Sequence, residues 1–168
     1  MRDDSTQLVS CIPRLRRYAR ALVGDHGGAD DLVQDTLERA WGKLSLWRRG
    51  SDMRAWLFGI MHNLHIDQIR KPAVPTVVLD DDTPVPSFCP APANRLEMRD
   101  IESALRLLPA EQREILLLVA LEEMTYEEVA TALHIPVGTV MSRLSRARER
   151  VRALMDGRPV VSPLKVIK

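Results

Sequence analysis

Hydrophobic residues recur at intervals of three and four along most of this chain. Between residue 5 and about residue 23 the recurring positions are Leu8, Ile12, Leu15, Ala19 and Leu22. This spacing places them on one face of an amphipathic helix. Pro13 interrupts the segment, so we expect the helix either to be kinked there or to begin only at Ile12.

The same periodicity predicts further helices over residues 28–44, 53–70, 95–107 and 109–123. In the first of these, the positions expected to face a core are Leu32, Val33, Thr36, Leu37, Ala40, Trp41 and Leu44. Residues 45–52 form a loop, and either Ser51 or Asp52 can cap the helix that follows. Residues 72–94 hold most of the prolines and the acidic run 80–82, which predicts an extended linker.

A tight helical pair is predicted near the end of the chain. Thr125 is followed three residues later by Glu128, the pattern of a capping box, so a helix should begin at Tyr126. Pro136 cannot continue that helix, which predicts a turn over residues 134–136. The apolar stripe of the next helix is Val140, Leu144, Ala147, Val151 and Leu154, and Gly157 follows as a left-handed cap. Two helices joined in this way form a helix-turn-helix.

The other face of the second helix carries hydroxyl and basic side chains. The residues expected to point away from the apolar stripe are Ser142, Arg143, Ser145, Arg146, Glu149 and Arg150, with Thr139 at the start of the helix and Arg148 and Arg152 on its flanks. An arginine-rich helix alone is often only a solvated face. Because this one follows a capped helix and a proline-broken turn, the pattern favours insertion into a DNA major groove.

Composition favours an all-helical protein of 168 residues, since 45% of them are hydrophobic and only 4% aromatic, with no alternating run typical of a strand. The net charge is only +1, but acidic and basic residues are segregated along the chain. No segment approaches a membrane span or a signal peptide, so we expect a cytoplasmic protein in which Cys11 and Cys89 are free thiols.

The second helix of the pair carries a resemblance to a known family. The run PVGTVMSRLSRARERV is similar to region four of the extracytoplasmic-function (ECF) sigma factors, which give bacterial RNA polymerase its promoter specificity. The resemblance implies that this helix reads the minus-thirty-five element. The DNA-binding residues that it implies here are Thr139, Met141, Ser142, Arg143, Ser145, Arg146 and Arg148. Met141 stands where the family commonly has Arg or Lys.

Two earlier runs resemble region two of the same family. The run DDLVQDTLERAW is similar to the segment that docks on the clamp helices of the largest polymerase subunit. The polymerase-binding residues that this implies are Asp31, Gln34, Asp35 and Glu38. The run RAWLFGIMHNLHIDQIRK resembles regions 2.3 and 2.4, which open the minus-ten element and hold a flipped base. By position, Arg48, Arg49, Ser51 and Asn63 would form the pocket for that base.

Together these resemblances imply two small helical domains joined by a Pro-rich linker. Residues 5–71 would be a region-two bundle of three or four helices, 72–94 the linker, 95–157 the region-four helix-turn-helix and 158–168 a tail. The implied partners are core RNA polymerase, promoter DNA and an anti-sigma factor, with no cofactor or metal and no catalytic residue. The alternatives are a stand-alone helix-turn-helix regulator, and an enzyme that holds a metal through His62 and His65.

Overall fold

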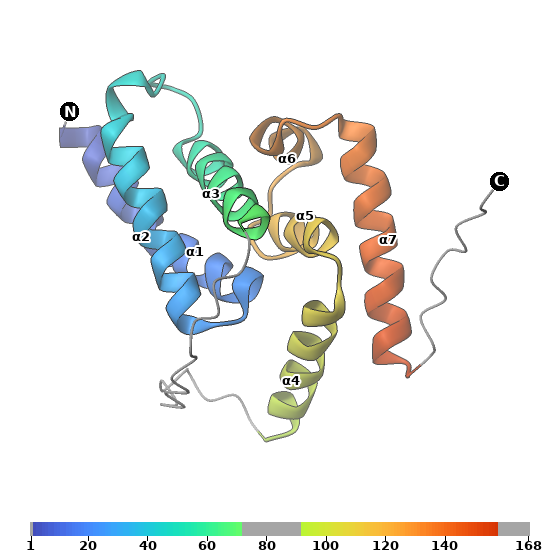
Figure 1. Cartoon of the computed structure of the whole chain (residues 1–168). Coiled ribbons are helices and arrows are strands. Elements are labelled where there is room, and N and C mark those ends of the chain that lie inside the picture. Colours follow the sequence, from blue (N-terminus) through green and yellow to red (C-terminus); the bar gives the residue numbers. More distant parts are fainter. Residues whose placement is uncertain (1, 72–91, 158–168) are drawn as a thin grey trace.

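The computed structural model describes residues 2–71 and 92–157, and this part of the chain is helical without a strand (Figure 1). The helices are α1 Arg2–Val23, α2 His26–Gly42, the 3-10 turn η1 Leu44–Leu46, α3 Met53–Arg70, α4 Pro92–Leu107, α5 Ala110–Ala120, α6 Tyr126–Leu133 and α7 Val137–Met155. The all-helical class predicted from the sequence is confirmed. Residues 72–91 of the predicted linker, the tail 158–168 and Cys89 lie outside the described residues.

The first helix is longer than its sequence suggested. It begins at Arg2 and continues through Pro13, so the expected start at residue 5 or at Ile12 is wrong. Pro13 lies on the exposed side of the helix, where water can replace the hydrogen bond that its ring removes. The fourth helix also begins early, at Pro92 rather than at residue 95.

Helices α1, α2 and α3 pack into one bundle. Leu15, Leu32 and Leu57, one from each helix, are completely or almost completely buried at its centre. Asp52 is the N-cap of α3, and its carboxylate accepts a hydrogen bond of 2.9 Å from the backbone N–H of Arg54. Of the two caps that the sequence left open, the structure therefore selects Asp52.

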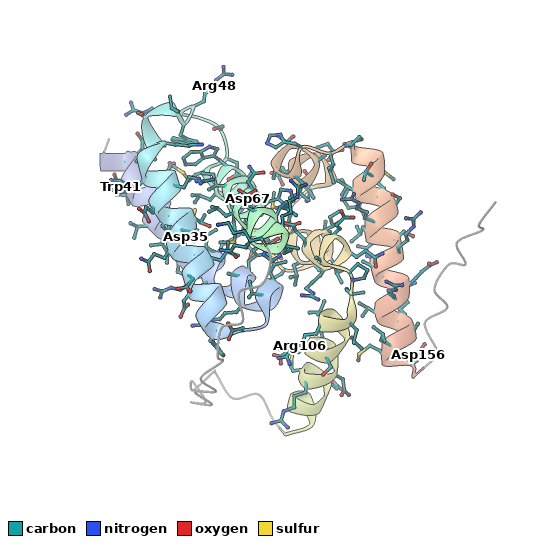
Figure 2. The ribbon with its side chains drawn as sticks, in the orientation of Figure 1. Asp35, Trp41, Arg48, Asp67, Arg106 and Asp156 are labelled. Carbon is teal, nitrogen blue, oxygen red and sulfur yellow. The ribbon has the colours of Figure 1, made fainter. Side chains whose placement is uncertain are left out.

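One residue of α2 does not lie where the periodicity placed it. Trp41 is 60% exposed, so its prediction as a core residue is wrong. The helix ends at Gly42, directly after Trp41, and the chain then turns into η1. Within the described part of the chain, the indole therefore lies largely at the surface of the last turn of α2 (Figure 2).

Helices α4 to α7 form a second unit, in which α7 packs against α4, α5 and α6. Its buried centre includes Ile115 of α5, Val129 of α6 and Leu144 of α7. Arg113 holds the α4–α5 turn together, because its guanidinium donates to the backbone carbonyls of Leu105 (2.7 Å) and Leu108 (3.0 Å).

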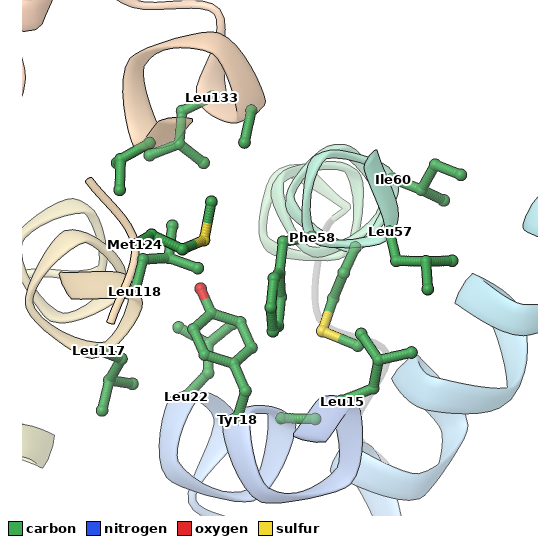
Figure 3. Close-up of a cluster of buried hydrophobic side chains, with 14 of the residues drawn as sticks. Leu15, Tyr18, Leu22, Leu57, Phe58, Ile60, Leu117, Leu118, Met124 and Leu133 are labelled. Atoms are coloured by element: carbon green, nitrogen blue, oxygen red, sulfur yellow. The ribbon is translucent and has the colours of Figure 1, made fainter. Parts of the chain in front are cut away.

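The two units share one hydrophobic core. Helix α3 packs on α6, and α1 packs on α5. Figure 3 shows Tyr18 of α1 and Phe58 of α3 beside Leu118 of α5, and the two rings stand edge to face with their centroids 4.8 Å apart. Within the described residues, no helix is both long and apolar enough to cross a membrane.

Candidate protein and nucleic-acid interfaces

The predicted helix-turn-helix is present in full. Thr125 accepts a hydrogen bond from the backbone N–H of Glu128 (3.2 Å), and the Glu128 carboxylate accepts one from the backbone N–H of Thr125 (2.8 Å). This capping box starts α6. His134 ends α6 in the left-handed conformation, with φ of 54°, and Pro136 precedes the first residue of α7. Gly157 follows α7 with φ of 66°, as expected of a left-handed cap.

The outer face of α7 carries most of the side chains expected to bind DNA. Val140, Leu144 and Ala147 are buried against the other helices, which turns the opposite face outward. The exposed residues on that face are Met141, Ser142, Ser145, Arg146 and Arg148. Arg146 and Arg148 have no ion pair within the part of the chain that the structure describes, so both guanidinium groups are available to a ligand.

Two of the predicted DNA-binding residues are partly covered. Thr139 is half-buried, and its backbone carbonyl accepts a hydrogen bond of 3.1 Å from the Ser142 hydroxyl. Arg143 lies at the edge of the buried stripe, where its guanidinium is 3.3 Å from the carboxylate of Glu111 on α5. Of the basic residues in this helix, Arg146 is therefore better placed to reach a base edge than Arg143.

The residues predicted to bind polymerase, three carboxylates and one amide, are exposed together on α2. They are Asp31, Gln34, Asp35 and Glu38. No ion pair occupies any of them among the described residues. A hollow of about 730 Å³ lies between α1 and α2 at the edge of this surface. One wall includes Gln34, Glu38 and Trp41, and the other includes Val9 and Ile12. The outer face of α2 thus combines carboxylates with an exposed indole, a residue that the periodicity had assigned to the core.

The residues predicted to hold a flipped base are only partly brought together. Ser51 and Asn63 line one hollow of about 620 Å³, together with the ring of Trp56. Arg49 instead forms an ion pair of 3.1 Å with Asp4 at the start of α1. Arg48 extends outward at the tip of the loop (Figure 2). The structure therefore groups two of the four residues and places the two arginines beside that group.

The second unit closes this hollow on one side. Its far wall is formed by Glu127, Glu128 and Thr131 of α6. Helices α3 and α6 approach closely because Gly59 has no side chain: a Cβ atom there would lie 3.1 Å from the backbone oxygen of Ala132. A strand of nucleic acid entering the hollow would meet two carboxylates, which repel phosphate.

The contact between the units contains a buried carboxylate that the sequence did not reveal. Glu122, directly after α5, is completely buried. Its Oε1 accepts a hydrogen bond of 3.0 Å from Arg17 of α1, and its backbone carbonyl accepts one of 2.9 Å from Arg54 of α3. Among the described residues its Oε2 has no hydrogen-bond partner, and the Arg14 guanidinium is 3.9 Å away. Two helices of the first unit therefore hold this one residue of the second.

His62 also belongs to this contact. Its Nδ1 lies 2.7 Å from Oε1 of Glu114, a buried residue of α5. Burial lowers the pKa of the neighbouring His65, which favours its neutral form. Within the described residues, no group of three His, Cys, Asp or Glu side chains is placed to hold a metal ion. The histidine pair considered above as a metal site is thus partly engaged in joining the two units.

The fold and these surfaces define a class: an all-helical protein of two units, one with a helix-turn-helix and one with an acidic outer face. Two family models match the chain, the sigma2 domain of PhyR over residues 8–62 and region 4 of sigma-70 over residues 98–151. The chain is 37% identical to the ECF RNA polymerase sigma factor EcfG of Rhodopseudomonas palustris, over 92% of this chain and 84% of that protein. It therefore belongs to the ECF family of RNA polymerase sigma factors, which direct promoter-specific transcription initiation.

Solved structures of similar proteins share the fold. The sigma factor RpoE of Bartonella quintana, solved with the anti-sigma factor NepR, is 34% identical with a TM-score of 0.76, over 93% of this chain and 98% of that one. CnrH, solved with the cytosolic domain of CnrY, is 29% identical with a TM-score of 0.69, over 94% and 90% of the two chains. The stand-alone regulator considered as an alternative above is not favoured by these matches.

Proposed function

We propose that this sigma factor docks on core RNA polymerase through the outer face of α2. The observation that carries the proposal is the exposure of Asp31, Gln34, Asp35 and Glu38 on one surface, without ion pairs among the described residues. The clamp helices of the largest polymerase subunit are the expected partner. Trp41 extends the acidic face with apolar area, and an exposed aromatic side chain beside polar groups is typical of an interface anchor.

The two units then read two promoter elements. Helix α7 enters the major groove of the minus-thirty-five element, with Arg146 and Arg148 toward the DNA and Met141 available for apolar contact with a thymine methyl. Ser51 and Asn63 contact the unpaired minus-ten strand, and Arg48 binds its phosphates, joined by Arg49 when that residue exchanges Asp4 for a phosphate. The chain acts by binding and positioning, without catalysis of its own, in the cytoplasm.

Contact with both promoter elements requires the packed units to separate. Asn63 shares its hollow with Glu127 and Glu128 of α6, so movement of α6 away from α3 removes two carboxylates that would repel the phosphates of an entering DNA strand. Helices α3 and α7 both pack in contact with α6. Two promoter elements that lie more than one helical turn of duplex apart are separated by over about 34 Å. While α3 and α7 both pack against α6, they are too close together to contact both elements at once.

The regulatory partner is an anti-sigma factor. The support is that this chain shares its fold with two proteins solved with a partner. RpoE was solved with the anti-sigma factor NepR, and CnrH with the cytosolic domain of CnrY. A protein that binds both units at once would favour the packed arrangement and thereby lower the fraction of molecules able to bind a promoter.

Charge reversal on α2 tests the docking surface. Asp35→Lys should weaken binding to purified core polymerase in a pull-down or a titration, whereas Asp156→Lys, a reversal beyond the end of α7, should not. Circular dichroism and thermal melting should be unchanged for Asp35→Lys, because the residue is exposed. Equal binding by wild type and Asp35→Lys would show that α2 is not the docking surface.

A further inference from the structure

One ion pair ties the loop before α3 to the start of the chain. Arg49 donates hydrogen bonds from Nε (3.2 Å) and Nη2 (3.1 Å) to the same carboxylate oxygen of Asp4, Oδ2. Asp4 belongs to the first turn of α1, 45 positions away in the sequence. The two side chains differ in exposure: that of Asp4 is 12% exposed, whereas that of Arg49 is 72% exposed and is accessible to a ligand from solvent.

The pair lies within the loop proposed to bind the minus-ten strand. Arg48, the residue before Arg49, extends outward at the tip of this loop (Figure 2). Ser51 lines the hollow that also contains Asn63. The loop is tight between them, because the backbone N–H and the hydroxyl of Ser51 both donate to the carbonyl of Arg48, at 3.1 and 2.6 Å. A strand that contacts Arg48 and enters the hollow therefore passes Arg49.

A carboxylate and a phosphate compete for the same guanidinium donors. Both groups present anionic oxygens that accept hydrogen bonds from the planar fork of an arginine side chain. In the structure, Oδ2 of Asp4 occupies the donors Nε and Nη2 of Arg49, so a DNA phosphate takes these two donors only by displacing the carboxylate. The displacement costs little free energy, because an ion pair with one well-exposed partner is weak.

We propose that Asp4 is an internal competitor for the phosphate contact of Arg49 and thereby sets the affinity of the protein for the unpaired minus-ten strand. A strand that binds Arg49 must first break the pair, and the released carboxylate then repels the phosphate beside it. Both effects weaken binding. Neither depends on base sequence, because phosphate contacts carry no sequence information. The inference rests on the proposed function, since it concerns the loop proposed to bind this strand.

The test uses holoenzyme assembled from the full chain and core polymerase, with a promoter fragment whose minus-ten strand is unpaired. We expect Asp4→Asn to bind this fragment about fivefold more tightly than wild type, with a similar gain on a fragment whose unpaired strand is scrambled. Asp3→Asn is the matched control, the same loss of charge at the adjacent exposed residue, and should stay within about twofold. Arg49→Gln should weaken binding and reduce the slope of its salt dependence by about 0.7 units.

The double variant Asp4→Asn with Arg49→Gln separates competition from a merely structural role. It should bind like Arg49→Gln alone, because without the guanidinium the carboxylate has no donors to withhold. Weaker binding by Asp4→Asn, or an equal gain in the presence of Arg49→Gln, would overturn the proposal. A gain limited to one base sequence would also overturn it, since that result would indicate a change in the hollow of Ser51 and Asn63.

The single variants keep this inference distinct from the proposed function. If Arg49→Gln binds the fragment as tightly as wild type, Arg49 makes no phosphate contact, and the proposed role of this residue in minus-ten binding is wrong. If Arg49→Gln weakens binding but Asp4→Asn does not tighten it, only the competition by Asp4 is refuted.

Discussion

Two exposed apolar side chains lie within the surfaces proposed to bind polymerase and DNA. Trp41 is the clearest case, because a large indole that is 60% exposed carries an unfavourable contact with water unless a partner covers it. Met141, 53% exposed on the face of α7 that is proposed to bind DNA, is the second. Each lies beside polar groups of one kind, carboxylates on α2 and arginines on α7.

Removing the indole should weaken polymerase binding. We expect Trp41→Ala to lower affinity for core polymerase by a factor of roughly thirty, because central aromatic anchors contribute about 2 kcal/mol or more to an interface. Leu107→Ala is the matched control, a similarly exposed apolar residue on α4. Both variants should keep the wild-type thermal midpoint. If the two changes have equal effects on affinity, Trp41 is not an anchor.

The residues of α7 should separate sequence readout from charge attraction. Met141→Arg adds a cation to the exposed face and should steepen the salt dependence of minus-thirty-five duplex binding by about one unit of slope. Arg146→Ala should relax sequence preference, since a bidentate arginine–guanine contact contributes about 1–3 kcal/mol of discrimination. Salt titrations with specific and scrambled duplexes measure both. An unchanged slope for Met141→Arg would place residue 141 away from the DNA.

At the scale of the element, the short helix α6 depends on its ends. It has only eight residues, and isolated helices of that length are unstable in water. The capping box satisfies backbone donors at the start of α6. At its other end, His134 adopts the left-handed conformation and ends the helix directly after Leu133. Because α6 supports α7 and also packs on α3, its stability matters to both units.

Loss of the cap should destabilise the fold measurably. We expect Thr125→Ala to lower the free energy of unfolding by about 1 kcal/mol, because its hydroxyl accepts a hydrogen bond from the first turn of α6. Thr131→Ala is the control within the same helix. Thr131 is exposed and bonds only to the Glu127 carbonyl in the preceding turn, so alanine there should be neutral or slightly stabilising. Denaturant titrations that give equal values for the two variants would contradict the role of the cap.

Elements with local signals were predictable from the sequence. The capping box, the proline-broken turn and the Gly157 cap each depend on residues a few positions apart, and each is confirmed. The full length of α1 was not predictable, because proline is unfavourable within a helix and only the structure shows that Pro13 lies on the exposed side. Trp41 was predicted in the core because it follows Val33 and Leu37 at intervals of four, but each such step advances about 40° around a helix and brings Trp41 beside Glu38 on the outer face.

For the whole molecule, the sequence did not predict that the two units pack together. Glu122 lies in an acidic run of the sequence, yet it is buried and bonded to Arg17, more than a hundred positions away in the chain. No periodicity or motif encodes such a pairing. The site residues divide in the same way: the exposed faces of single helices were predicted, whereas the wall that α6 adds to the hollow of Ser51 and Asn63 needed the structure.

A substitution at the closest approach of the units should separate them. We expect Gly59→Val to increase the radius of gyration in small-angle scattering, because its Cβ would lie 3.1 Å from the Ala132 carbonyl oxygen and its methyl groups need further space. Gly42→Val is the control, a helical glycine with no neighbouring atom within 4 Å of the added Cβ. Identical scattering profiles for Gly59→Val and wild type would show that the close approach does not hold the units together.

Transcription on defined promoters tests the central claim that this chain reads two DNA elements for core polymerase. The assay combines purified core polymerase and the full chain with a genomic promoter library, followed by permanganate footprinting of unpaired thymines on the selected promoters. Wild type should start transcripts at sites that share two spaced elements and should open the minus-ten element. Asn63→Ala should retain duplex minus-thirty-five binding but lose the footprint, whereas Gln68→Ala, an exposed residue further along α3, should keep both. Absence of specific transcripts with wild type, or a normal footprint with Asn63→Ala, would contradict the account.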